Sequence, residues 1–314
     1  MLEHLVLSLR VIYFDDEEDE KPVTNLDASI FKFGASKLTF LLLDFCAIVK
    51  ARPPLSNIST LWLENRGIEE SRFDTQAFID LLSLPSLEHV LFVGDFTEQA
   101  DLARWIEMPN LKRFFFSRFA AIWSFLSNIR APHLETLMVF NCTFDETTAN
   151  STLLMDQSYC FPALKNLWIV ESELIPVVAL DFIKLTSRAT EVLITHNSLD
   201  GSFLTTIVDL DDLNRERIWP HLKTLICNIK GLAKIDPYLA FAKSQPKKSE
   251  FKLKLRHRLL DDWEKTSADQ FNTLKEVCTV EGMDKENWIE QQHFWPRDIM
   301  KYHNDDPYYV HLDY

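Results

Sequence analysis

One short phrase recurs along this chain: a proline, one further residue, and then the pattern Leu-x-x-Leu-x-Leu or a close variant. The clearest copy is FPALKNLWI, whose apolar positions are Leu164, Leu167 and Ile169. Four more copies begin at Pro85, Pro109, Pro132 and Pro220. Internal repeats build one structural unit per copy, so they constrain the fold more than any other feature of the sequence.

Copies that lack the proline extend the series to nine, with first apolar positions at residues 2, 38, 58, 87, 111, 134, 164, 189 and 222. Most of the intervals lie in or near the roughly 20 to 29 residues of a leucine-rich repeat, which contributes one strand and one helix per unit. In that repeat an Asn or Cys follows three residues after the last apolar position. Cys46, Cys142 and Asn197 fit, whereas the other six copies, Ser172 among them, do not.

We therefore predict an α/β fold, a leucine-rich-repeat solenoid with a curved parallel sheet on the concave side and helices on the convex side. The expected strands, in chain order within one sheet, are at about 4–8, 40–44, 60–64, 89–93, 113–117, 136–140, 166–170, 191–195 and 224–228. Apolar spacing of three and four predicts amphipathic helices in TQAFIDLLSL, ADLARWIEM, FAAIWSFLSNI, IPVVALDFIKLT and GSFLTTIVDLDDL.

We expect the chain to divide into two units: residues 1–256 form the solenoid, and residues 257–314 form a C-terminal capping region and tail. The stretch KKSEFKLKLRHR, residues 247–258, alternates apolar and cationic residues. We interpret it as the terminal strand of the sheet, whose lysines prevent pairing with another chain. An anion site is the less favoured interpretation.

Composition excludes several partners. The formal net charge is -14, which opposes nucleic acid and anionic membrane surfaces because both are bound chiefly through Lys and Arg. The acidic run DDEEDEKP, residues 15–22, reads as a solvated insertion rather than a docking loop. No apolar run reaches the roughly 18 residues of a membrane span, and the five cysteines are dispersed. A cytoplasmic or nuclear location follows.

The sequence contains no motif for enzyme chemistry. Its six glycines form no phosphate-binding loop. His293, His303 and His311 lie near acidic residues, but their spacing does not match a zinc site. Adjacent carboxylates are expected to be solvated in so acidic a chain. We therefore expect no metal, no cofactor and no catalytic residues, and hence not an enzyme.

A column of apolar residues marks the candidate site. The residue between the second and third apolar positions of each copy points away from the core. It is apolar in all nine copies: Val6, Leu42, Trp62, Leu91, Phe115, Met138, Trp168, Leu193 and Ile226. A solvated sheet face should instead be polar here. One interpretation is a groove for a protein partner, formed by Trp62, Leu91, Phe115, Met138, Trp168 and Leu193, with Lys112, Arg113 and Lys165 beside it. The alternative interpretation has equal weight: the C-terminal tail or a loop covers the column, or the sheet is doubly wound with helices on both faces.

The phrases FPALKNLWI, MPNLKRFFF and IWPHLKTLIC resemble the leucine-rich region of fungal F-box-like proteins. The resemblance covers about residues 1–256. In that family an F-box binds the adaptor of a cullin-type ubiquitin ligase, and the repeats select the substrate. No F-box precedes Leu2, so the resemblance implies a substrate-binding module, with the ligase adaptor as a partner only if an F-box lies upstream. The alternative is an enzyme on a doubly wound α/β scaffold, with catalytic groups at the carboxyl ends of its strands.

Overall fold

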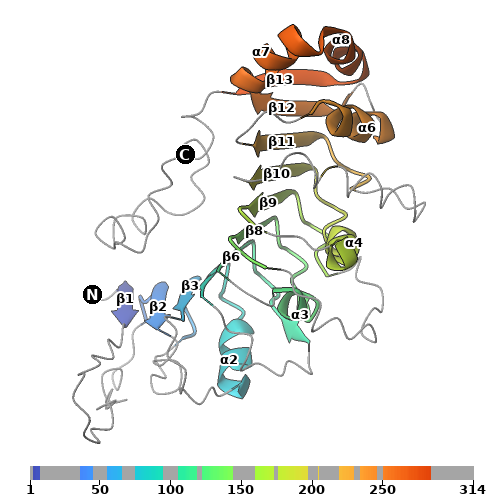
Figure 1. Cartoon of the computed structure of the whole chain (residues 1–314). Coiled ribbons are helices and arrows are strands. Elements are labelled where there is room, and N and C mark those ends of the chain that lie inside the picture. The colour runs from blue at the N-terminus through green and yellow to red at the C-terminus, as the bar shows by residue number, and fades with distance from the viewer. Residues whose placement is uncertain are drawn as a thin grey trace, which may run out of the picture.

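An open parallel sheet organises the molecule (Figure 1). The structure is a computed structural model. It describes residues 3–7, 36–44, 55–65, 75–94, 105–118, 122–143, 160–172, 176–196, 204, 219–229, 234–245 and 250–283. Eleven described strands pair in the order β1-β2-β3-β4-β6-β8-β9-β10-β11-β12-β13, so each strand lies beside its neighbour in the chain, apart from the two short strands β5 and β7.

The strands lie where the repeated phrase predicts them. They are β1 (His4–Leu7), β2 (Phe40–Asp44), β3 (Thr60–Glu64), β4 (His89–Val93), β6 (Arg113–Ser117), β8 (Thr136–Phe140), β9 (Asn166–Val170), β10 (Glu191–His196), β11 (Thr224–Ile229), β12 (Lys252–Arg256) and β13 (Thr279–Met283). The nine expected strands agree with β1 to β11 of this sheet to within one residue at each end. The prediction of one parallel sheet in chain order is confirmed.

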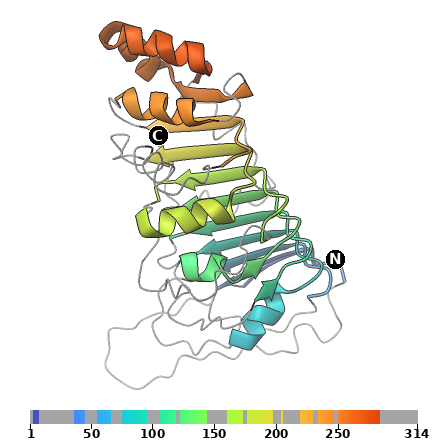
Figure 2. The ribbon, with the colours of Figure 1, turned by 90° about the vertical axis from the view of Figure 1, so that its right-hand side faces the viewer.

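Helices cover one face of the sheet. They are α2 (Thr75–Leu82), α3 (Ile122–Leu126), α4 (Pro176–Leu185), α6 (Asp236–Ser244), α7 (His257–Thr266) and α8 (Ala268–Val277). In Figure 1 the strands follow an arc with α2, α3, α4 and α6 on its outer side, and Figure 2 shows the same four helices in front of the strands. A doubly wound sheet reverses its strand order, and no reversal occurs among the described strands.

The main core fills the space between the sheet and these helices. It contains the second and third apolar residues of the repeated phrase, such as Leu137 and Val139 or Leu167 and Ile169, all at most 2% exposed. A cluster of phenylalanines joins α2 and α3 to the strands: Phe78, Phe92, Phe114, Phe116 and Phe125, with ring centroids 4.2 to 6.2 Å apart. Burial of these rings and branched chains is the main source of stability in such a core.

The helix expected in ADLARWIEM is wrong in its described part. Ile106–Glu107 is instead a two-residue strand, β5, paired in parallel with β7 (Ile129–Arg130). The buried Ile106 and Ile129 join the main core, while the guanidinium of Arg130 lies 4.3 Å from the ring centroid of Trp105. The spacing of apolar residues alone did not distinguish a short buried strand from a helix turn.

The interpretation of residues 247–258 as the terminal strand is also wrong. β12 has β13 as its outer neighbour. Lys252 and Lys254 are therefore not on the edge strand of the sheet. Their Nζ atoms lie 3.4 and 3.9 Å from the carboxylate oxygens of Glu281 on the neighbouring strand β13. The core continues past residue 256 through α7 and α8, with Leu259, Trp263, Phe271 and Leu274 buried.

Some expectations lie outside the described residues. These are the acidic run at 15–22, Cys46, Asn197, the tail from residue 284 and most of the helix expected in GSFLTTIVDLDDL, of which only Leu204 is described. Among the described helices, none is long and apolar enough to cross a membrane.

Candidate interaction surface

The face of the sheet opposite the helices is built from three rows of side chains. Alternate residues of a strand point to opposite faces, and the strands pair without a shift in register, so equivalent positions line up across the sheet. The row nearest the amino ends of the strands contains Phe40, Thr60, His89, Arg113, Thr136, Asn166, Glu191 and Thr224. The middle row contains Leu42, Trp62, Leu91, Phe115, Met138, Trp168, Leu193 and Ile226.

The middle row is the apolar column of the sequence, and most of it is buried. Trp62 (3% exposed) and Leu91 pack with Phe40 and Leu42 in one cluster. Trp168 (7% exposed) and Leu193 (0% exposed) pack with Val170 and Ile226 in a second. Neither cluster contains a residue of a described helix, which places both on the helix-free face.

Phe115 and Met138 lie between the two clusters and are partly exposed. They are partners in the β6–β8 register, so their side chains are neighbours on the sheet face. Phe115 packs against the first cluster and Met138 against the second. The apolar column therefore has an accessible middle, which we call the central window, formed by Phe115 and Met138.

Two further apolar side chains that are partly exposed extend this face and were not predicted from the sequence. Val93 and Phe140 belong to the third row, two residues after the column positions of β4 and β8, and both are partly buried against the clusters. The period of two along a strand could have revealed them. At the corresponding position of β6, between them in the register, is Ser117, which interrupts the apolar row.

The predicted polar residues lie at the amino edge of the strands, and the structure pairs two of them with carboxylates. Lys112 Nζ lies 2.8 Å from Glu88, and Lys165 Nζ lies 2.9 Å from Glu135. Hydrogen bonding from these ammonium groups lowers the pKa of Glu88 and of Glu135. All four side chains are well exposed, so each pair contributes little stability.

Arg113 is partly buried and shares an environment with His89, its partner in the β4–β6 register. Burial, aided by the positive charge of Arg113, lowers the pKa of His89 to about 4. His89 is therefore neutral at physiological pH. This pair places one fixed charge, that of the guanidinium, two residues from Phe115 on the same face.

No metal site is formed by the described residues, since no three His, Cys, Asp or Glu side chains are grouped to hold an ion. His293, His303 and His311 lie outside the described residues. The four described cysteines, Cys142, Cys160, Cys227 and Cys278, are buried free thiols. Burial raises the pKa of the Cys227 and Cys278 thiols, which disfavours the reactive thiolate.

Comparison with known proteins gives little further guidance. No protein-family model matches the chain, and no curated protein matches its sequence. A crystal structure of a protein from Bacteroides fragilis aligns with 16% identity over 69% of this chain and 74% of that chain, at a TM-score of 0.39.

Proposed function

We propose that this protein is a non-enzymatic protein-interaction module on a leucine-rich-repeat solenoid, and that its partner binds the helix-free face at the central window. The observation that carries the proposal is the partial exposure of Phe115 and Met138, side by side, on a sheet face where the column residues described on either side of them, Leu42 to Leu91 and Trp168 to Ile226, are buried. Aromatic residues and methionine are enriched at the cores of protein interfaces.

The surroundings of the window support the same role. Arg113, on the Phe115 strand, supplies a charge of the kind often found at interface hot spots, and Val93 and Phe140 add partly exposed apolar surface. Lys112 and Lys165 provide a polar rim whose ion pairs with Glu88 and Glu135 remain solvated. An apolar centre within a polar rim is the usual anatomy of an interface.

Within this proposal, the resemblance to fungal F-box-like proteins suggests a particular role. The chain would be the substrate-recognition part of a ubiquitin ligase receptor, and the adaptor would bind only a chain that also carries an F-box. The adaptor should then co-purify with the protein expressed from its natural locus, and not with residues 1–314 alone.

The test compares what the wild-type protein and a Phe115→Ala variant retain from lysate of the source cells, by quantitative mass spectrometry. Removing an interface hot spot costs about 2 kcal/mol or more, so the true partner should bind the variant with an affinity about thirtyfold lower. Lys243→Ala, an exposed change on α6, serves as the control. Because Phe115 also packs against the first cluster, its truncation lowers stability somewhat, and binding is compared well below the melting temperature of the variant, where both proteins are folded.

Trp168→Ala separates the scaffold from the site. Because Trp168 is 7% exposed within the second cluster, its truncation should cost about 3 to 5 kcal/mol of folding stability. If no partner binds the central window, wild type, Phe115→Ala and Met138→Ala should retain the same proteins from the lysate in the same amounts. That result would refute the proposed function.

A further inference from the structure

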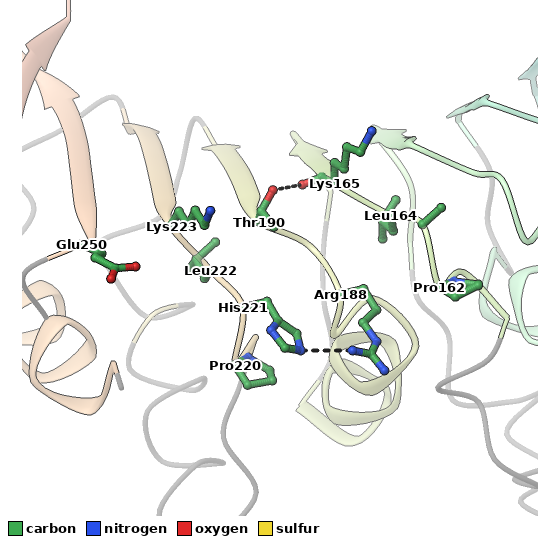
Figure 3. A pocket seen from close by; sticks show the side chains of 11 residues that line it. Pro162, Leu164, Lys165, Arg188, Thr190, Pro220, His221, Leu222, Lys223 and Glu250 are labelled. Carbon is green, nitrogen blue, oxygen red and sulfur yellow. Dashed lines mark hydrogen bonds between the residues drawn. The ribbon is translucent and has the colours of Figure 1, made fainter. Parts of the chain in front are cut away.

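A second surface lies at the amino edge of the sheet, away from the central window. Here a pocket of about 470 Å³ opens across the turns that lead into β9, β10, β11 and β12 (Figure 3). Its lining includes Pro162, Lys165, Arg188, Pro220, His221 and Lys223. The prolines are those of the repeated phrase, so the repeat itself shapes the pocket.

The pocket is cationic in a strongly acidic protein. Three basic side chains, Lys165, Arg188 and Lys223, line it against one carboxylate, that of Glu250, whereas the whole chain has a formal charge of -14. Lys165 is paired with Glu135 outside the pocket. Within the part of the chain that the structure describes, neither Arg188 nor Lys223 forms an ion pair. These two exposed cations therefore have no carboxylate within ion-pair distance among the described residues.

Buried contacts hold the walls of this pocket in place. The indole Nε1 of Trp219, which is fully buried, donates to Thr186 Oγ1 at 3.1 Å, and Thr186 Oγ1 donates to the carbonyl of Phe182 in α4 at 2.8 Å. Trp219 directly precedes the Pro220 wall, and Thr186 lies two residues before Arg188. The position of both walls is therefore set by the core, as pre-organised binding requires.

Arg188 and His221 also contact each other across the pocket. Arg188 Nη1 lies 3.3 Å from His221 Nε2, and Figure 3 shows the two side chains pointing toward one another. Because a guanidinium only donates hydrogen bonds, the imidazole Nε2 is the acceptor in this contact. The contact orients the guanidinium without neutralising its charge.

We propose that this edge pocket binds an acidic segment of a partner protein, in which two carboxylates lie three residues apart. Lys165 and Lys223 precede strands two positions apart in the sheet, which separates their backbones by about 10 Å, and Arg188 lies on the segment that leads into the strand between them. The ion pair of Lys165 with Glu135 is exposed and therefore weak, so a carboxylate of the bound segment can replace it. A polyproline II segment rises about 3.1 Å per residue with three residues per turn, so side chains at i and i+3 lie on one side about 9 Å apart. The two spacings match.

The charge of the whole chain decides which class of polyanion fits. A nucleic acid carries many phosphates, and those that extend past the pocket are repelled by the rest of the protein, whose net charge is -14. A short acidic segment brings only the charges that the pocket can pair. A peptide is thus favoured over an oligonucleotide, and the site extends beyond the proposed function because it does not include the central window.

The test measures binding of a fluorescent peptide, acetyl-Ser-Glu-Pro-Pro-Glu-Ser-amide, by fluorescence anisotropy at low and at moderate salt. The Arg188→Gln/Lys223→Gln variant should bind on the order of tenfold more weakly, since two exposed charge contacts are lost. The control Lys184→Gln/Lys243→Gln removes the same charge outside the pocket and should bind within about twofold of wild type. Added salt should weaken binding to the wild type.

Three results would overturn the proposal: equal binding of the peptide with both glutamates replaced by glutamine, equal loss in the control variant, or stronger binding of a single-stranded oligonucleotide than of the peptide. Circular dichroism of both double variants checks that they fold. Phe115→Ala should leave peptide binding unchanged, so failure of the pocket and failure of the central window are separable.

Discussion

The side-chain oxygen of Ser172 accepts a hydrogen bond from the backbone N–H of Cys142 at 3.1 Å, across the bends that follow β9 and β8. The same hydroxyl lies 3.0 Å from the carbonyl of Val170 and 3.3 Å from that of Val139. Ser172 therefore serves backbone groups of two adjacent repeats, which is the role expected of an Asn or Cys at this position. Serine departs from the Asn or Cys of the repeat pattern, yet its hydroxyl both accepts from and donates to the same backbone groups.

Ser172→Ala should lower the free energy of unfolding by about 1 to 3 kcal/mol, because the buried N–H of Cys142 loses its acceptor. Urea denaturation measures the change. Ser187→Ala, in the turn after α4, is the matched control and should stay within about 0.5 kcal/mol. If both variants unfold at the same urea concentration, the hydrogen bond between Cys142 N–H and the Ser172 hydroxyl does not stabilise the fold.

Gly94→Ala should be among the most destabilising single changes in the bends that follow the strands. Gly94 has a φ of 95°, and a Cβ atom there would lie against the backbone carbonyl of Asn65. The equivalent bend after β8 uses Asn141 at φ 49°, a residue that tolerates this conformation. Asn141→Gly should therefore change stability by less than about 1 kcal/mol, whereas Gly94→Ala should cost at least about 2 kcal/mol. Thermal unfolding of both proteins, with Asn141→Gly as the reference, would expose any reversal of this order.

Leu167→Ala should cost about 2 to 5 kcal/mol, because Leu167 is fully buried in the main core. Lys165→Ala, two residues earlier, should cost no more than about 0.5 kcal/mol, since its ion pair with Glu135 is exposed. Chemical denaturation of both variants tests the register of the strand. Similar losses from both would mean that the two positions do not differ in burial.

The stability of the protein should fall between about pH 6.5 and pH 4 through His89. The unfolded chain binds a proton on this residue near pH 6.5, while burial keeps the folded imidazole neutral until about pH 4. Stability is thus fully present above pH 6.5 and is lost on acidification, by up to about 3 kcal/mol. Denaturation of wild type and His89→Gln across this range isolates the effect, because all other groups titrate in both proteins. Parallel pH profiles would contradict it.

The sequence by itself determined nine of the eleven strands of this sheet, those from β1 to β11. Their positions, parallel pairing and register follow from the repeated phrase, because the proline and the alternation of Leu137, Val139 and their equivalents act within a few residues of one another. Local rules of this kind do not depend on what packs elsewhere. The same alternation identified the apolar column as the part of the sheet turned away from the core.

Only the tertiary structure decided what depends on residues distant in the chain. It buried Trp62 and Trp168 while leaving Phe115 and Met138 partly exposed, although all four share one sequence pattern. It converted Ile106–Glu107 from an expected helix into a strand by pairing it with β7, and it placed β13 beside β12. It also brought Arg188 within 3.3 Å of His221, 33 residues later. Stacking of successive repeats makes these contacts, and no local spacing encodes them.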